Sequence, residues 1–423
     1  MSDKKREEGP GEDARSTQEL PPDERLTEDM DDEEAPRERL SPEARRELAA
    51  VLRGMEKLAR LIEQRESFSA GAVVFKFLHV LTERSNGVQV LLFERSLPHG
   101  VGGYVVVKRL QNPVGYHRRQ RMKDEVQLAF RLHHPAIAQV HHFRVFGGVP
   151  YLIMEYVDGP QLESLLSTAA LRCKPLSAPF ALYVAAEVAD ALDYAHTRTE
   201  LEEGGRPLGI IHRDVSPRNI RVGRKSGEVK LTDFGAAYSK LVGREETAGL
   251  LKKGDLLYAS PEYLRCELMD ARSDIFSLGL VLLEALTARH LFDRWEGEAP
   301  APVAEVKVVA EEATPLPLAR MLALVERYGP EDVERAAAGL PEGLKALLHK
   351  ALQRDPARRH VSAAEVRQEL RAQLIVLAPH YGRQEAAEEV QRLLSEASAL
   401  RDVAAPTEGG LYPEFLDGHE LEG

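Results

Sequence analysis

The order of its apolar segments constrains the fold of this chain more than any other feature. Between residues 69 and 110, the runs VVFKFLHVL, VQVLLFERS and GYVVVKRL are rich in β-branched and aromatic residues and are separated by polar turns, which is typical of strands. A helical pattern follows at about residues 118–132, more strand-like sequence reaches MEYV at 154–157, and the remainder is mainly helical. Strands first and helices later predict an α+β protein with a small β-rich lobe, holding one key helix, and a larger helical lobe.

Charge and cysteine content exclude several classes of function. The 423 residues carry a formal net charge of −12, which argues against nucleic acid or an acidic membrane surface as the main partner. The two cysteines, Cys173 and Cys266, form no CxxC motif, so we do not expect a thiolate zinc site. So few cysteines fit a protein of the reducing cytosol. The N-terminus has no apolar signal region, and no apolar run reaches the roughly 18 residues that a membrane span needs. We therefore expect a cytoplasmic protein.

Both ends of the chain differ in composition from its middle. Residues 1–40 hold most of the excess negative charge and almost no large apolar side chains, which predicts a disordered acidic tail. Residues 41–66 begin with Ser-Pro-Glu, a helix-starting signal, and carry one amphipathic stripe. This helix could pack on its own domain, or it could mediate self-association or bind a partner. Residues 377–423 predict a helical piece and an acidic end, and residues 296–340 a partly helical insertion.

The strongest chemical signal is HRDVSPRN, residues 212–219, followed by DFG, residues 233–235. Phosphoryl transfer depends mainly on positioning and on neutralising charge. An aspartate near the acceptor hydroxyl can orient it and take its proton, and Asp214 is of that type. A second aspartate, Asp233, and an amide, Asn219, supply the hard oxygen ligands that Mg²⁺ prefers.

With these motifs the chain resembles the protein kinase family, specifically the eukaryotic-like serine/threonine kinases of bacteria. The resemblance implies a two-lobed kinase fold over residues 72–376, with an N-lobe at 72–153 and a C-lobe at 157–376. It also implies that Asp214 is the catalytic base, that Asn219 and Asp233 bind Mg²⁺, and that His212 and Arg213 support the catalytic loop.

Further parts of the family pattern occur in the family's order. VVVK ends the third strand run at Lys108, which should reach the α- and β-phosphates of ATP. Glu125, eight residues before His133-His134-Pro135, stands where the family places the glutamate that pairs with that lysine. LIMEYVDG resembles the hinge between the lobes, so the resemblance assigns the adenine pocket to Met154, Glu155 and Val157.

Two later motifs resemble the parts of protein kinases that support the recognition of a protein substrate. Ser260-Pro261-Glu262 occupies the place of the family's APE motif, and Glu262 could pair with Arg359. DIFSLG, residues 274–279, resembles the start of the buried central helix of the larger lobe.

The phosphate-covering loop departs from the family pattern. GxGxxG would fall on TERSNG, where Thr82 and Arg84 replace the first two glycines and Gly87 remains. Glycines allow the backbone to approach the phosphates, so side chains here should hold the loop further off. Arg84 could substitute a charge for the lost amide contacts.

Departures also occur around the base and the purine. Ser216 replaces the lysine that usually touches the transferring phosphate, which removes a positive charge, with Lys252 and Lys253 as candidate stand-ins. Asp255 stands where a threonine normally contacts the base; it would raise the pKa of Asp214 if close, or it points to solvent or to Arg218.

By alignment to the motifs, Val106 lies above the purine, where the family has an alanine, and Arg221 lies below it. A valine there crowds the pocket modestly. An arginine could stack its guanidinium on adenine or turn away from the pocket.

These observations predict a protein kinase that uses ATP and Mg²⁺ and acts on Ser or Thr hydroxyls of protein substrates. The alternative is a pseudokinase that binds nucleotide or partners without transferring phosphate. A small-molecule kinase is disfavoured by the SPE and DIFSLG motifs. Arg213 beside the base suggests regulation by a phosphate on Thr247, and the absence of a lysine at Ser216 leaves the choice between Ser/Thr and Tyr open.

Overall fold

The computed structural model describes residues 67–70, 72–83, 88–100, 102–110, 126, 129–146, 149–199, 207–234, 237, 255–292 and 318–404. The acidic segment 1–40, the helix 41–66, Arg84, Gly87, Glu125, Thr247, Lys252 and Lys253 lie outside these residues, as does the side chain of Thr82, and what was expected of them stays a prediction.

The N-terminal lobe is a six-stranded antiparallel sheet with the strand order β1-β2-β3-β4-β6-β5. Alternate residues of its central strands, including Phe75, Phe93 and Val105, bury one face of the sheet, which is the period-2 pattern expected of a half-buried strand. The strands are β1 (Ser67–Ala70), β2 (Val73–Glu83), β3 (Val88–Ser96), β4 (Gly102–Leu110), β5 (Val140–Phe146) and β6 (Val149–Glu155).

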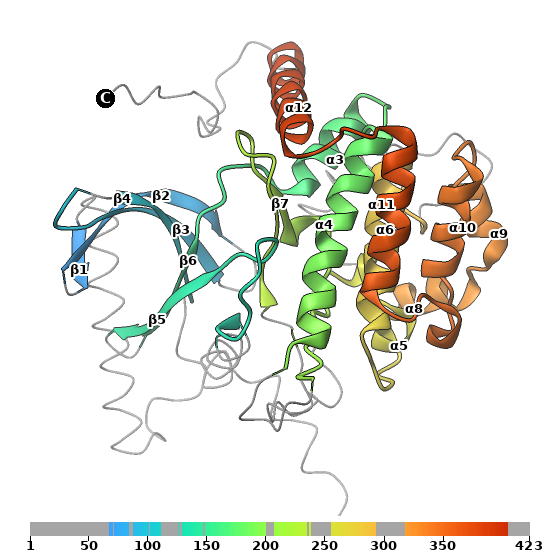
Figure 1. Ribbon diagram of the computed structural model, residues 1–423, viewed down its shortest axis with the longest axis horizontal. Coiled ribbons are helices and arrows are strands. Elements are labelled where there is room, and N and C mark those ends of the chain that lie inside the picture. Colours follow the sequence, from blue (N-terminus) through green and yellow to red (C-terminus); the bar gives the residue numbers. More distant parts are fainter. Residues whose placement is uncertain are drawn as a thin grey trace, which may run out of the picture. The chain divides into compact units, whose positions relative to one another are not determined.

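The C-terminal lobe is helical apart from a small hairpin, and α4, α6 and α11 lie side by side within it (Figure 1). The hairpin joins β7 (Ile220–Val222) to β8 (Val229–Leu231). The helices are α3 (Leu162–Leu171), α4 (Ala178–Thr197), α5 (Pro261–Leu264), α6 (Arg272–Thr287), α8 (Leu318–Arg327), α9 (Pro330–Ala336), α10 (Glu342–Ala351), α11 (Ala363–Leu377) and α12 (Arg383–Ala404).

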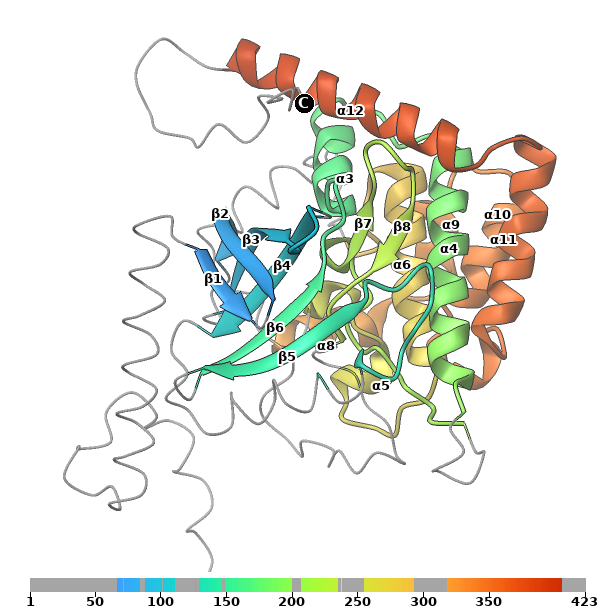
Figure 2. The same ribbon diagram turned by 60° about the vertical axis from the view of Figure 1, so that its left-hand side comes forward.

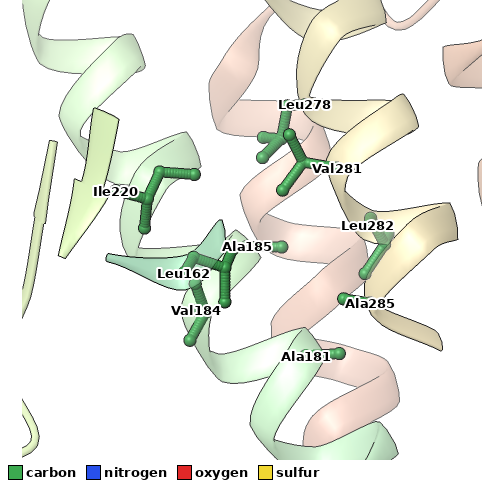
Figure 3. A pocket seen from close by; sticks show the side chains of 9 residues that line it. All are labelled: Leu162, Ala181, Val184, Ala185, Ile220, Leu278, Val281, Leu282 and Ala285. Carbon is green, nitrogen blue, oxygen red and sulfur yellow. The ribbon is translucent and has the colours of Figure 1, made fainter. Parts of the chain in front are cut away.

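Helix α6 forms the centre of this lobe, as the resemblance of DIFSLG to the start of a buried central helix predicted. Its residues from Ser273 to Leu286 are all buried, so it is enclosed on every side. Gly279 permits the tightest approach, because a Cβ there would lie 3.0 Å from the side chains of Ala351 and Leu352. A cavity of about 10 Å³ between α3, α4, α6 and β7 is lined only by apolar side chains (Figure 3), which fits an empty packing defect better than a ligand site.

The folded unit extends beyond the predicted limits at both ends. Strand β1 pairs with β2, so the sheet begins at Ser67 and not at residue 72. Helices α8 and α9 bury Met321, Val325 and Val333 in the lobe's core, so the described part of the predicted insertion belongs to the domain. Helix α12, expected as part of a tail, also joins that core through Val390. None of the described helices is long and apolar enough to cross a membrane.

Candidate active site

The loop that carries Asp214 is anchored by a buried carboxylate at the start of α6. Asp274 accepts hydrogen bonds from the main-chain N–H groups of His212 (2.8 Å) and Arg213 (2.9 Å), and His196 Nε2 lies 2.8 Å from its Oδ2. Burial alone would raise the pKa of Asp274, but the hydrogen bond and charge of His196 hold it below the ordinary value. This anchoring holds Arg213 in the left-handed region, with φ 66°.

Two donors fix the carboxylate of Asp214. The main-chain N–H of Asp255 donates to Oδ1 at 2.9 Å, and Asn219 Nδ2 donates to Oδ2 at 2.8 Å. Burial, and then the negative charge of Asp233, raise the pKa of Asp214 to about 7 despite these bonds. The carboxyl group is therefore oriented and has a pKa suited to accepting a proton near neutral pH.

Asp255 contacts Asp214 through its backbone. Its carboxylate instead caps the 3₁₀ turn η5 (Leu256–Tyr258) by accepting from Leu257 N at 3.1 Å. Burial raises the pKa of Asp255, and the positive charge of Arg218 opposes that rise. The expected repulsion is present, but it ranks below burial and Asp233 among the causes that raise the pKa of Asp214.

Lys108, on β4, pairs with the metal-binding candidate Asp233 across the two lobes. Lys108 Nζ lies 2.9 Å from Asp233 Oδ1, and both side chains are largely buried. Asp233 has a φ of 64°, a backbone conformation that non-glycine residues adopt rarely and that gathers at functional sites. Phe234 packs edge-on against His212, with ring centroids 4.5 Å apart, which joins the DFG segment to the catalytic loop.

The oxygen atoms on Asn219 and Asp233 fit a magnesium site. Asn219 is buried, its Nδ2 is used by Asp214, and its Oδ1 has no hydrogen-bond partner among the described residues. An unsatisfied buried carbonyl oxygen is costly unless a cation or another ligand binds it. Carboxylate and amide oxygens are the ligands that Mg²⁺ takes, and no described cluster of three His, Cys, Asp or Glu offers another metal site.

The candidate adenine-side residues lie on neighbouring strands and just beyond them. Val106 of β4 is directly opposite Met154 of β6, both are half-buried, and Val157 is fully buried. The carboxylate of Glu155 is taken by Lys230, at 2.7 Å, and by the main-chain N–H of Gln139, at 3.0 Å. The main-chain N–H of Glu155 donates to the carbonyl of Gln139 at 2.8 Å, which leaves its main-chain carbonyl oxygen as the candidate contribution to a nucleotide site.

Arg221 is anchored at the turn that follows the hinge. Its Nη1 donates to the carbonyl oxygen of Gly159 at 2.7 Å. A Cβ on Gly159 would lie 1.9 Å from the carbonyl oxygen of Val222, so glycine is required where this turn meets β7. Of the two expectations for Arg221, the structure favours the guanidinium turned to the protein backbone.

Ser216 occupies a buried position two residues after Asp214. It is 1% exposed, and its Oγ has no hydrogen-bond partner among the described residues. The missing lysine is therefore not replaced by a contact of the serine hydroxyl within the described part of the chain.

The predicted ion pair between Glu262 and Arg359 is confirmed. Arg359 donates from Nη1 and Nη2 to the two carboxylate oxygens at 2.7 and 2.8 Å, and Ser273 Oγ adds a bond of 2.6 Å. Burial alone would raise the pKa of Glu262, but the hydrogen bonds and charge of Arg359 hold it below the ordinary value. This buried pair fixes the segment that carries Asp255 and the SPE motif to the turn that precedes α11.

Sequence reasoning missed the positioning roles of Asp274, His196 and Lys230. Each is a buried charged or polar side chain, and a buried charge requires a partner; only Lys230 stands between apolar neighbours, in the strand Val229–Leu231. That pattern signals a structural contact from sequence, but only the fold identifies the partner.

Comparison with known proteins agrees with this geometry. A family model described as "Protein kinase domain" matches residues 97–370. The serine/threonine-protein kinase PknB of Mycolicibacterium smegmatis is 34% identical over 291 residues, covering 68% of this chain and 39% of PknB. The serine/threonine-protein kinase PknJ of Mycobacterium tuberculosis is 32% identical over 306 residues, covering 70% of this chain and 45% of PknJ.

A third relative is named for a different acceptor residue. The tyrosine-protein kinase MasK of Myxococcus xanthus is 33% identical over 238 residues, covering 55% of this chain and 36% of MasK. The chain thus spans less than half the length of each of these three relatives.

Proposed function

This chain belongs to the protein kinase family, and we propose that it transfers the γ-phosphoryl group of ATP to serine or threonine hydroxyls of protein substrates. The observation that carries the proposal is the constellation of Lys108, Asp233, Asn219 and Asp214. Lys108 Nζ lies 2.9 Å from Asp233, and Asn219 Nδ2 lies 2.8 Å from Asp214. A positive charge is thus paired with one candidate oxygen ligand and the proposed base with the other, and the charge of Asp233 acts on Asp214, which brings together the groups that phosphoryl transfer requires.

Each residue has a defined task in this proposal. Asp214 orients the acceptor hydroxyl and takes its proton, for which a pKa of about 7 is favourable. Lys108 supplies positive charge to the α- and β-phosphates. Asn219 Oδ1 and the carboxylate of Asp233 would hold Mg²⁺, which when bound neutralises charge on the phosphates.

We assign the acceptor to the Ser/Thr class because PknB and PknJ are named for it. Tyrosine is the alternative acceptor that the experiment must exclude. MasK is named for tyrosine, and Ser216 stands where serine/threonine kinases usually have a lysine. The Glu262–Arg359 pair, which fixes the segment after Asp255, supports a protein substrate over a small molecule. We place the activity in the cytoplasm, where Cys173 and Cys266, both free and exposed, would stay reduced.

Regulation by phosphorylation also remains part of the proposal. Arg213 precedes the base and is held by Asp274, so a phosphate on Thr247 could pair with its guanidinium. A Thr247→Ala variant with undiminished activity would remove this element and leave the rest intact.

The test is transfer of label from γ-labelled ATP to a generic protein substrate in the presence of Mg²⁺, followed by phosphoamino-acid analysis. We expect labelled phosphoserine or phosphothreonine. Label only on phosphotyrosine would revise the acceptor class. Absence of label, together with no rise in melting temperature on adding Mg·ATP, would refute the proposed function.

A further inference from the structure

Helix α12 lies outside the residues that match the kinase family and yet packs into the catalytic domain. The family match ends at residue 370, whereas α12 spans Arg383–Ala404. Figure 2 shows α12 crossing the ends of α3 and α4 and passing beside the β7–β8 hairpin. Its inner face is closely packed, because Ala386 and Val390 are fully buried and Leu393 is 3% exposed.

We infer that α12 is a positioning element of the nucleotide and metal site, acting by holding the β7–β8 hairpin in place. The inference rests on the proposed function. The hairpin matters because its two ends lead directly to the candidate ligands: Asn219 immediately precedes β7, and Asp233 follows β8 by two residues.

The turn of the hairpin lies directly against the first residue of α12. Gly227 has a φ of 60°, and a Cβ there would lie 1.8 Å from the carbonyl oxygen of Arg383. Glycine is therefore required at this turn for both its backbone conformation and its contact with the helix. The carbonyl of Gly227 also accepts from the hydroxyl of Tyr183 on α4 at 3.0 Å.

A second contact connects α12 to the end of the hinge. Gln391 Nε2 donates to the carbonyl oxygen of Arg224 in the hairpin at 3.1 Å. Arg224 in turn donates its main-chain N–H to the carbonyl of Asp158, at 2.8 Å, and its guanidinium forms an ion pair with the Asp158 carboxylate at 2.9 Å. The helix, the hairpin and the segment after the hinge thus form one chain of contacts.

A buried carboxylate fixes α12 itself. Glu389 is 6% exposed and accepts from the N–H and Oγ of Ser177, at 3.1 and 2.6 Å, and from the hydroxyl of Tyr381, at 3.2 Å. Ser177 caps the start of α4, a helix that also packs against β8 of the hairpin. Several donors on one buried carboxylate define the position of α12 against the C-lobe, since leaving that charge unpaired would be costly.

The hairpin is short enough to transmit a movement of its turn. Each of its strands has three residues, and Thr232 N donates to the carbonyl of Asn219 at 2.8 Å, which joins the two ligand-bearing ends. Loosening α12 should therefore displace Asn219 and Asp233 together. A shift of about 1 Å in catalytic groups can cost on the order of 100-fold in rate.

The experiment compares the full-length chain with its variant Val390→Asp, which places a charge in the buried face of α12. Ser398→Asp, on an exposed position of the same helix, is the matched control. Gly227→Ala perturbs the same contact from the hairpin side and serves if Val390→Asp does not fold. The measurements are hydrogen exchange of the amides of residues 220–231, and the KM for ATP and for a generic protein substrate.

We expect faster exchange in the hairpin and a rise in the KM for ATP of about tenfold, with the KM for the protein substrate changed by less than about twofold. Ser398→Asp should match the wild type in hairpin exchange, in the KM for ATP and in the KM for the protein substrate. A lower melting temperature with unchanged hairpin exchange and unchanged KM for ATP would overturn the inference, because α12 would then only stabilise the fold. Hairpin exchange needs no catalysis, so it tests whether α12 holds the hairpin even where a wild type without label transfer and without a melting shift on adding Mg·ATP has refuted the proposed function.

Discussion

Asp255 orients the carboxylate of Asp214 through its backbone: the main-chain N–H of Asp255 donates to Asp214 Oδ1 at 2.9 Å. The side chain of Asp255 instead caps the turn that follows it. The family's usual threonine is absent, but a donor to the base is retained. The replacement of threonine by aspartate at position 255 therefore changes the contacts of Asp214 less than the change of side chain alone indicates.

This contact predicts different results for two substitutions of Asp255. Asp255→Ala keeps the N–H and loses the cap and the minor charge repulsion on Asp214, so it should retain most of the activity. Asp255→Pro removes the N–H, while its φ of −82° is close to that of proline, so it should lower kcat by about tenfold or more. Steady-state kinetics of the two purified variants check this, and equal loss in both would contradict it.

The raised pKa of Asp214 predicts a pH-dependent cost in stability. The folded-state pKa is about 7 and the reference value 3.8, so the proton on Asp214 stabilises the folded state fully below pH 3.8, and that contribution is lost as the pH rises to 7. Asp214→Asn carries no charge and avoids this cost. Its melting temperature, measured without Mg²⁺, should exceed that of the wild type by a few degrees at pH 8 and by less at pH 5.

The control for this measurement is Glu388→Gln, an exposed carboxylate on α12. The difference in melting temperature between Glu388→Gln and the wild type should be the same at pH 5 and pH 8. An advantage of Asp214→Asn that is equal at pH 5 and pH 8 would show that the carboxyl group is not destabilised by ionisation.

Two of the buried serines, Ser216 and Ser273, predict different responses to truncation. Ser216 Oγ has no partner among the described residues, so Ser216→Ala should leave the free energy of unfolding unchanged or increase it. Ser273 Oγ donates to the Glu262 carboxylate at 2.6 Å, so Ser273→Ala should cost about 1–3 kcal/mol, as expected for a bond to a charged group. Urea denaturation distinguishes them, and a loss at Ser216 as large as that at Ser273 would reveal an unseen partner.

The Glu262–Arg359 pair predicts a large loss of stability when one partner is removed. Glu262→Gln leaves the buried guanidinium without its counter-charge, and breaking such pairs costs about 3–5 kcal/mol. The matched control is Lys76→Gln, because Lys76 and Glu94 are exposed and 4.0 Å apart, and such pairs contribute little. Melting temperatures that fall equally in both variants would contradict the role of burial.

Much of the fold could be predicted from the sequence because its signals are local. Period-2 apolar runs mark the strands around Phe93 and Val105, and the continuous apolar run from Ile275 marks the central helix. The domain limits failed where packing decides. The helical pattern of α12 was predicted, but its burial in the C-lobe core was not, and neither was the pairing of β1 with β2.

The site could be predicted only in part. The motifs identified Asp214, Asn219 and Asp233 by residue type and order, and the structure joins Asn219 to Asp214 and Lys108 to Asp233. Three features depend on tertiary geometry, which the spacing of motifs does not encode. They are the backbone N–H of Asp255 that binds Asp214, the carboxylate of Asp274 that anchors the loop, and the direction of the Arg221 side chain.

The central claim is that Asp214 is the base of a site in which Lys108 and Asp233 hold Mg·ATP. The most direct test measures both phosphate transfer and the melting shift on adding Mg·ATP for the wild type, Asp214→Asn and Lys108→Met. The account predicts that Asp214→Asn keeps the melting shift and loses transfer by about 10²–10⁴-fold, whereas Lys108→Met loses both. Transfer that persists undiminished in Asp214→Asn would contradict it.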